Sequence, residues 1–448
     1  MARTQNKLIP RPEISLRFRG KKKGGPSRAN TRQRIPVISG IGVVSPIGTG
    51  TDKFWKNLCD SVSGVERISL FDPSQFPSQI AAEVRDFDVG EHLNRTQQKN
   101  YSRGTSFAVA AAQMAATSAG HPDLDPYRTD VLIGSAVSSY DQVQEDLVHA
   151  GMERGDDQLY RPGAIDPLSM LKSFIHAPAS AIALRYNVKG YVSTISTACS
   201  SGLNAIGQAA ERVRSGMCDS VFAGGVDTPI TRFFLAGYCS ANFLTTENHA
   251  GGQSLCPFDR RRSGAALGEG SAVFFIEEKR QALARGARIF CEIAAFQQEN
   301  ENVNEVYLSD RSGHAWAEML KNLLGKLRSP RIDYINAHGP SDVHIDKLEA
   351  RALHRAFAGD AEHIPTTSIK GQVGSGMASA GVFQVAAGAL SIYHNRIPPM
   401  FNYREPDPEI QLNVKPPGRR RGPLKQVLVN GHAVGGINAA LVLRRNNV

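Results

Sequence analysis

The chain has 448 residues, 41% of them hydrophobic, and a formal net charge of +10. This length predicts two domains or one large fused core. No run of about 18 apolar residues occurs, so we expect no membrane span. The six cysteines form no CxxC pair, which indicates neither a zinc site nor a disulfide framework. A reducing, cytoplasmic compartment fits this cysteine usage best.

The excess positive charge lies at one end of the chain. Residues 1–34 contain eleven of the 52 basic residues and one of the 42 acidic residues. The rest of the chain therefore has equal numbers of each and is neutral overall. We predict a basic, disordered arm over residues 1–34. Its composition also suits an organelle transit segment, or contact with nucleic acid, an anionic membrane or an acidic protein, but not a secretory signal. A basic tail on a neutral body does not by itself indicate a nucleic-acid enzyme, and we expect no nucleic-acid partner.

Apolar β-branched runs alternate with alanine-rich segments along the rest of the chain. The elements predicted, in chain order, are strand 35–48, helix 52–65, helix 104–119, strand 129–137, strand 220–231, strand then helix 270–289, strand 332–339, helix 384–395 and two strands over 426–445. This alternation predicts an α/β protein with buried sheets. Both ends run from an apolar strand into a glycine-rich loop, which suggests two related halves, 35–290 and 291–448.

The stretch "STISTACSSGLNAIGQAAERV" (193–213) places Cys199 among small residues where a helical pattern begins. A thiol on the first turn of a helix would be stabilised as thiolate by the helix dipole and nearby backbone N–H groups. Its own N–H would help to stabilise an oxyanion. The alternative is that Cys199 is a small buried core residue.

Two more segments carry candidate functional residues. His338 directly follows an apolar strand in "INAHG", where it would either partner a cysteine nucleophile or be structural. Lys370 precedes a glycine-rich loop and a helix, an arrangement compatible with anion binding. The loop lacks the GK[ST] of a P-loop, and no Rossmann fingerprint starts a strand–helix unit, so we do not expect nucleotide binding.

These segments, with "GIGVVSPIG", "CPFDRRRSGAALGEGSAVFFIEE", "YINAHG" and "VGGIN", resemble the β-ketoacyl-acyl carrier protein synthases, in particular the elongating synthase II of bacterial fatty acid synthesis. The resemblance covers residues 35–445. It implies a duplicated, thiolase-like αβαβα five-layer fold and a dimer.

The resemblance implies a role for each matching residue. Cys199 matches the acyl-accepting nucleophile, His338 the first catalytic histidine, Lys370 the lysine of the "K-x-x-x-G-H" loop, and Glu349 the acid that pairs with this lysine. The amides of Cys199 and Val434 would form the oxyanion hole. An acyl chain would load onto Cys199, malonyl-carrier would decarboxylate, and its carbanion would form a carbon–carbon bond. No cofactor or metal is implied, because the phosphopantetheine belongs to the carrier protein.

The sequence departs from the family pattern at the donor side of the site. Ser375 stands in place of the second catalytic histidine, which gives a Cys-His-Ser variant of the triad. "GPSD" replaces "GTST", where two threonines hold the pantetheine arm, and "SGA" and "AVGGIN" lack the aromatic residues of "DGF" and "GFGGTN". The substrate-binding residues predicted at these positions are Pro340, Asp342, Ala265, Val434 and Gly435.

We expect a condensing enzyme of a specialised fatty acid or polyketide pathway. One alternative is an acyltransferase, hydrolase or cyclase that uses the acyl-cysteine without decarboxylation. Another is a non-catalytic partner subunit, although the inactive chain-length-factor relatives lack the cysteine. The expected partner is an acidic acyl carrier protein that docks on Arg260, Arg261 and Arg262, with the arginines at 419–421 as further candidates. We expect a homodimer, or a heterodimer with a related subunit.

Overall fold

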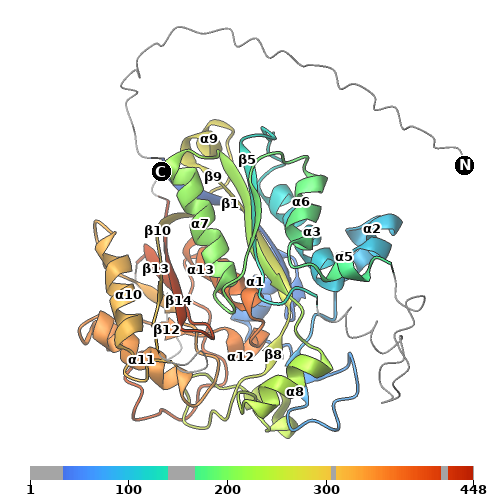
Figure 1. Ribbon diagram of the computed structural model, residues 1–448. Coiled ribbons are helices and arrows are strands. Elements are labelled where there is room, and N and C mark those ends of the chain that lie inside the picture. Colours follow the sequence, from blue (N-terminus) through green and yellow to red (C-terminus); the bar gives the residue numbers. More distant parts are fainter. Residues whose placement is uncertain (1–33, 140–166, 304–308, 415–421, 447–448) are drawn as a thin grey trace, which may run out of the picture. The chain divides into compact units, whose positions relative to one another are not determined.

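The computed structural model describes residues 34–139, 167–303, 309–414 and 422–446 (Figure 1). Most of the basic arm and the arginines at 419–421 lie outside these residues. The described part contains a sheet of 11 strands and a separate sheet of three strands. None of its helices is both long and apolar enough to span a bilayer.

The first part of the chain alternates short strands with helices. Its strands are β1 (Pro36–Ser45), β2 (Gly48–Thr49), β3 (Val65–Arg67), β4 (Ile80–Ala82), β5 (Thr129–Gly134), β6 (Val192–Ile195), β7 (Ser220–Asp227), β8 (Leu267–Gly268) and β9 (Gly270–Glu278). Its helices are α1 (Thr51–Cys59), α2 (Arg95–Asn100), α3 (Arg103–Ser118), α5 (Ser169–Ser173), α6 (Ala177–Arg185), α7 (Ser201–Ser215), α8 (Arg232–Ser240) and α9 (Lys279–Ala284).

The rest of the chain repeats this alternation with fewer elements. Its strands are β10 (Cys291–Asn300), β11 (Tyr334–Asn336), β12 (Thr366–Thr367), β13 (Gln426–Gly431) and β14 (Ile437–Arg444). Its helices are α10 (His314–Gly325), α11 (Ile345–Ala356), α12 (Lys370–Val373) and α13 (Ala378–His394). Each element predicted from the sequence is present, with boundaries shifted by a few residues.

The strand order reveals a duplication. The large sheet runs β12-β11-β13-β14-β10-β1-β9-β7-β5-β6. On each side of the β10–β1 junction, three outer strands are parallel and the inner two are antiparallel. The junction itself is short, with Val37 opposite Glu292 and Ile38 opposite Cys291.

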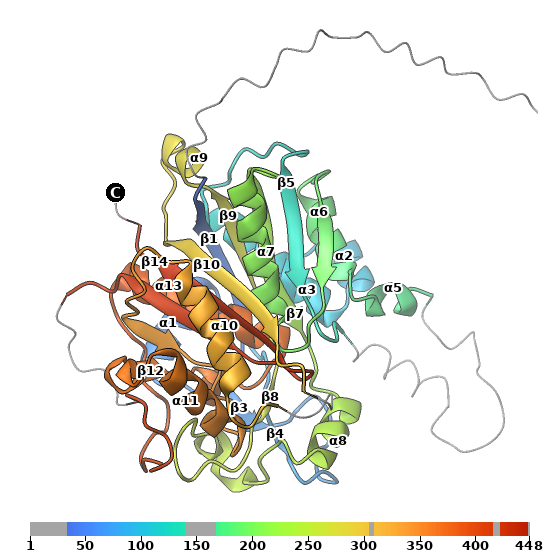
Figure 2. The same ribbon diagram turned by 60° about the vertical axis from the view of Figure 1, so that its left-hand side comes forward.

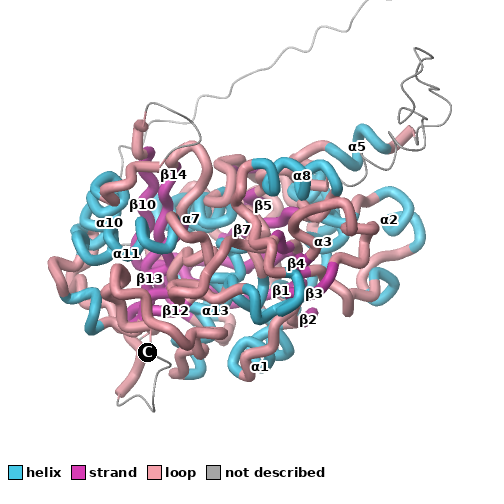
Figure 3. Tube along the Cα trace, turned by 90° about the horizontal axis from the view of Figure 1, so that it is seen from below, coloured by secondary structure: helices cyan, strands magenta, loops and turns pink. Residues whose placement is uncertain are grey.

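Helices cover both faces of the sheet, and two of them pack between its β1–β6 part and its β10–β14 part. Helices α3 and α6 pack on the β1, β9 and β5 side, α10 and α11 pack on the β10 and β14 side, and α7 and α13 lie between (Figure 2). Three apolar clusters match these layers, a central one on α7 and α13 and two outer ones. Figure 3 shows the strands in magenta enclosed by helices in cyan. The predicted αβαβα fold is therefore confirmed.

The predicted boundary of the arm is wrong by one residue. The guanidinium of Arg34 forms an ion pair with Asp219 at 2.6 Å and donates to the carbonyl oxygens of Val213 and Cys218. Arg34 is therefore fixed to the end of α7 and belongs to the folded body. The composition of residues 1–34 could not reveal this ion pair, because nothing in the sequence distinguishes Arg34 from the other arginines of the basic arm.

One buried carboxylate ties together three segments that surround the centre of the fold. Asp227, at the end of β7, accepts hydrogen bonds from the Ser135 hydroxyl, from the backbone N–H groups of residues 136–138 and from the N–H of Ala378 at the start of α13. The ends of β5 and β7 are thereby fixed to the central helix α13.

Replacing Asp227 with Ala leaves these buried donors without an acceptor. Each unpaired buried donor costs about 1–3 kcal/mol, so we expect the free energy of unfolding to fall by at least about 3 kcal/mol in urea denaturation at pH 7. Asp60→Ala, which removes an exposed pair with Lys56, is the control and should leave the unfolding midpoint unchanged. Equal effects of the two substitutions would contradict the role of Asp227.

Candidate active site

Cys199 lies on a sharp turn between β6 and α7. Ala198, just before it, adopts a φ of 49°, a left-handed conformation that costs a non-glycine residue about 1 kcal/mol or more. The turn is closed by hydrogen bonds from the Ser201 N–H and hydroxyl to the Ala198 carbonyl oxygen. The small side chains predicted to permit this turn do so, and they leave the half-buried thiol of Cys199 facing a cavity.

Burial governs the ionisation of this thiol. Desolvation raises the pKa of Cys199, and the carboxylate of Asp227 adds to that rise. The Lys370 ammonium and the backbone N–H groups of Val434 and Cys199 oppose it by stabilising the thiolate. The net direction of the shift in the pKa of Cys199 is upward. The backbone N–H groups favour the thiolate, as predicted from the sequence, but desolvation has the larger effect on the pKa.

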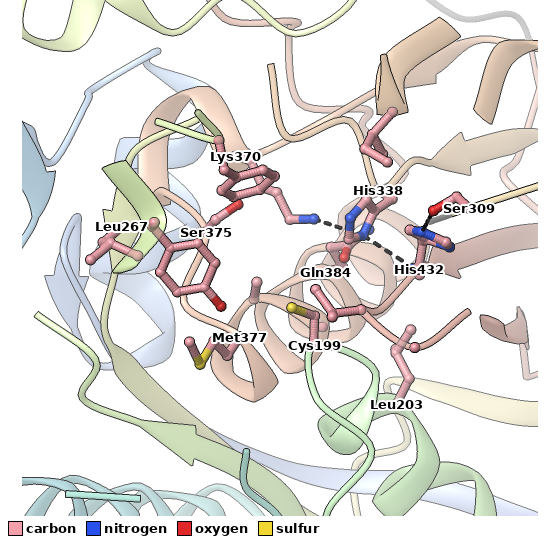
Figure 4. Close-up of a pocket in the computed structure, with 18 of the residues that line it drawn as sticks. Cys199, Leu203, Leu267, Ser309, His338, Lys370, Ser375, Met377, Gln384 and His432 are labelled. Atoms are coloured by element: carbon pink, nitrogen blue, oxygen red, sulfur yellow. Dashed lines mark hydrogen bonds between the residues drawn. The ribbon is translucent and has the colours of Figure 1, made fainter. Parts of the chain in front are cut away.

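His338 follows β11 and is held in one tautomer. Its Nδ1 lies 2.8 Å from Nζ of Lys370 and accepts from the backbone N–H of His432 at 3.3 Å (Figure 4). Because Nδ1 accepts, the ring proton resides on Nε2. Burial, followed by the charge of Lys370, lowers the pKa of His338 well below its ordinary value. The site therefore holds a neutral imidazole with an N–H to donate.

Lys370 and Glu349 both support His338, but by different routes. The carboxylate of Glu349 accepts from the backbone N–H groups of His338 and Gly339 and from the Asn430 amide. Lys370 donates to the His338 ring, and burial lowers the pKa of Lys370 to about 8. The expected direct pair between Lys370 and Glu349 is absent from the ion pairs of the described residues. The carboxylate fixes the backbone of His338, and the amine fixes its ring.

Cys199, His338, Lys370 and Ser375 line one cavity of about 410 Å³. The hydroxyl of Ser375 makes no hydrogen bond to any residue that the structure describes, so it is free to donate to a ligand. Apolar side chains supply much of the wall: Leu203, Phe243, Leu267, Ile345 and Met377. A volume in this range suits an organic ligand. No group of His, Cys, Asp and Glu suited to a metal ion occurs in the described ranges.

The predicted substrate-binding residues divide into two groups. Val434 and Gly435 line the cavity, whereas Pro340, Asp342 and Ala265 do not. The buried carboxylate of Asp342 accepts from the backbone N–H groups that begin α11, at 2.8 Å each. Pro340 and Ala265 are also buried. Contact of these three residues with the substrate therefore stays a prediction, and the structure shows that the Asp342 carboxylate already has backbone partners.

The arginine triplet also divides. Arg262 is buried, pairs with Asp407 at 2.8 Å and donates to backbone carbonyls, so its predicted role in docking a partner is wrong. Arg261 is half-buried and binds the Asp259 carboxylate through two nitrogens. Arg260 is exposed. Only Arg260 presents a free surface of the kind that docking requires.

His432 and Ser309 are among the lining residues that were not predicted from the sequence. His432 follows β13, and its Nε2 lies 2.8 Å from the Ser309 hydroxyl. A signal for His432 was present, because "NGH" at the end of β13 repeats the "NAH" that places His338 at the end of β11. No such signal marks Ser309, which lies in a loop far from both strands in sequence.

The pH dependence of Cys199 alkylation tests this electrostatic account. Because Lys370 lowers the pKa of Cys199, Lys370→Met should raise that pKa further. The iodoacetamide reaction, followed by peptide mass mapping between pH 7 and 10, should then move to higher pH in the variant. Lys321→Met, which removes an exposed ammonium outside the cavity, is the control. A shift to lower pH in Lys370→Met would contradict the account.

Family models match most of this chain. The model described as "Beta-ketoacyl synthase, N-terminal domain" matches residues 34–282, and that described as "Beta-ketoacyl synthase, C-terminal domain" matches residues 290–404. The first match includes Cys199, and the second includes His338 and Lys370.

Individual relatives cover nearly the whole chain. It is 36% identical over 418 residues to the actinorhodin polyketide putative beta-ketoacyl synthase 1 of Streptomyces coelicolor, covering 92% of this chain and 89% of the relative. It is 32% identical over 419 residues to 3-oxoacyl-acyl-carrier-protein synthase 2 of Coxiella burnetii, covering 92% and 99%.

Two solved structures show the same fold with a TM-score of 0.84. One is a type II polyketide synthase acyl carrier protein in complex with its ketosynthase bound to the hexaketide, at 28% identity. The other is the ishigamide ketosynthase/chain length factor, at 30% identity. Each comparison covers 93% of this chain and 100% of the other.

Proposed function

This chain belongs to the β-ketoacyl synthase family, and we propose that it joins an acyl chain held on Cys199 to a malonyl unit carried by an acyl carrier protein. One observation carries the proposal. The thiol of Cys199, two backbone N–H groups and the Lys370-fixed imidazole of His338 meet at one cavity. That set contains a nucleophile, donors for an oxyanion and a donor for an enolate.

The first half-reaction is a transthioesterification. The Cys199 thiol releases its proton to solvent water, and the resulting thiolate attacks the carbonyl carbon of the carrier's acyl thioester. The N–H groups of Cys199 and Val434, which both lie beside the sulfur, hold the negative oxygen of the tetrahedral intermediate. The pantetheine sulfur then leaves and takes up the proton that Cys199 lost. The apolar wall of the cavity accommodates the acyl chain.

The second half-reaction breaks one carbon–carbon bond and forms another. The malonyl carboxylate leaves as carbon dioxide, and its bonding electrons pass into the thioester as an enolate. The Nε2–H of His338 and the hydroxyl of Ser375 donate to the enolate oxygen. The nucleophilic carbon attacks the acyl carbonyl, and the Cys199 thiolate is expelled and reprotonated. The products are a β-ketoacyl carrier, carbon dioxide and free enzyme.

We assign the pathway to polyketide or specialised fatty acid synthesis. Several relatives are polyketide ketosynthases, and one is a tetracenomycin ketoacyl synthase alpha subunit. Solved structures of similar proteins include an acyl carrier complex and a ketosynthase/chain length factor assembly. These support a carrier protein and a related second subunit as partners, with the phosphopantetheine supplied by the carrier.

Mass spectrometry of Cys199 and measurement of carbon dioxide test the reaction. The native enzyme should gain an acyl group from acyl-carrier and then release carbon dioxide from malonyl-carrier as the β-ketoacyl product forms. Cys199→Ala should give neither adduct nor product. Ser375→Ala should load the acyl group normally but release carbon dioxide about 10²-fold more slowly, the usual cost of one lost oxyanion donor.

The same assay separates the alternatives. Acylation of Cys199 with no carbon dioxide release, even with the second subunit present, would replace condensation by acyl transfer, hydrolysis or cyclisation. If Cys199→Ala leaves the rate of product formation by the assembled complex unchanged, this chain is instead a non-catalytic partner subunit.

Arg260 is the proposed docking contact for the acidic carrier. Arg260→Glu should raise KM for acyl-carrier about tenfold, since reversing a rim charge weakens electrostatic attraction, and leave turnover of acyl-pantetheine unchanged. The control is Arg331→Glu, an exposed residue before β11, at the strand end opposite His338. An equal effect of both variants would contradict a specific contact.

A further inference from the structure

A second histidine side chain faces the cavity, and the condensation described above makes no use of it. His432 follows β13, as His338 follows the neighbouring parallel strand β11. The two rings therefore meet at one edge of the sheet, with centroids 6.1 Å apart (Figure 4). The backbone N–H of His432 serves His338. Its imidazole has a separate set of partners.

Those partners form a chain of hydrogen bonds with a fixed direction. The Glu301 carboxylate accepts from the Asn438 amide nitrogen at 2.9 Å, so the Asn438 oxygen is turned toward His432. That oxygen lies 2.7 Å from Nδ1 of His432, which must therefore carry the proton. The lone pair of Nε2 then faces the Ser309 hydroxyl at 2.8 Å. The imidazole is a base directed at a hydroxyl.

The surroundings hold this arrangement in place. The His432 ring stacks on Trp316 at a centroid distance of 4.9 Å and is 5% exposed. Trp316 is itself fixed by donation from Nε1 to Asn430. The second oxygen of Glu301 accepts from the backbone N–H of Asp310, which anchors the loop that carries Ser309. Burial lowers the pKa of His432, and the Glu301 carboxylate, 3.5 Å from Nδ1, opposes this shift.

This geometry does not reproduce the histidine that Ser375 replaces. A neutral imidazole that is protonated on Nδ1 has no proton on Nε2 to donate to a thioester oxygen. What His432 offers is a general base, bonded on one side to a hydroxyl and oriented on the other by an amide oxygen. A nucleophile, a base and an orienting group in series are the parts of a serine acyl-transfer centre.

We propose that Ser309 is a second acyl acceptor in this cavity, with His432 as its general base and Asn438 as the group that orients this base. The substrates are acyl thioesters of pantetheine, the class that the family already handles. This activity goes beyond the proposed condensation, because it forms an oxygen ester and requires neither Cys199 nor malonyl decarboxylation.

The step balances within the cavity. The Ser309 oxygen attacks the thioester carbonyl carbon while Nε2 of His432 takes the hydroxyl proton. The carbon–sulfur bond breaks, and the departing thiolate receives that proton from Nε2. A water molecule, deprotonated by the same nitrogen, then attacks the ester and releases a carboxylic acid and free Ser309. The net reaction is hydrolysis of the thioester, which would clear acyl chains that condensation does not extend.

The test uses the full chain with Cys199→Ala, so that the condensing nucleophile is absent. Two probes are applied, a fluorophosphonate, which labels activated serines, and octanoyl-pantetheine. We expect a covalent adduct on the peptide that contains Ser309 and release of octanoic acid. Adding Ser309→Ala or His432→Gln should lower the rate of fluorophosphonate labelling and the rate of octanoic acid release at least tenfold each. Adding Ser215→Ala, an exposed serine at the end of α7 and outside the cavity, should leave the fluorophosphonate adduct in place.

Adding Ser309→Cys provides a rescue, since a thiol beside His432 should regain the adduct with octanoyl-pantetheine. Circular dichroism of every variant establishes that the fold is kept. If Cys199→Ala shows no adduct at Ser309 and no acid release beyond that of the double variant with Ser309→Ala, the proposal is overturned. Failure of the condensation would be seen separately, as a lack of carbon dioxide release by the enzyme that retains Cys199.

Discussion

The site depends on the close packing of two buried helices. Where α7 passes α13, Gly202 lies so near the carbonyl oxygen of Ala378 that a single added methyl group would collide with it. This contact brings the turn that carries Cys199 beside the segment from Lys370 to Ser375. In the proposed reaction, residues before β10 supply the nucleophile, and residues after it supply the imidazole and the amine. Neither half contains a complete site.

Desolvation is the largest cause of the pKa shifts of Cys199, His338 and Lys370 in this cavity. It raises the pKa of the Cys199 thiol and lowers those of His338 and Lys370, so it favours the uncharged form of each group. In the proposed reaction, negative charge develops on the substrate oxygens opposite donors that are already in position. Such preorganised donors gain strength where water is excluded.

Much of this structure could be predicted from the sequence. Apolar β-branched runs mark the strands, and the family resemblance brings Cys199, His338 and Lys370 to one site. Effects that arise only from tertiary packing could not be predicted. The burial of Arg262, the use of Asp342 to begin α11 and the desolvation of Cys199 depend on neighbours distant in sequence. Ser309 was missed for the same reason, while the strand-end "NGH" could have revealed His432.

Residue 432 has two separable duties. Its main chain fixes the tautomer of His338, and any residue other than proline would preserve that donation. Its side chain alone contacts Ser309 and Asn438. The side chain at position 432 can therefore change while the backbone N–H at this position keeps the proton of His338 on Nε2. A duplicated ancestor could gain or lose a second reactivity here by point substitution, without first weakening the older one.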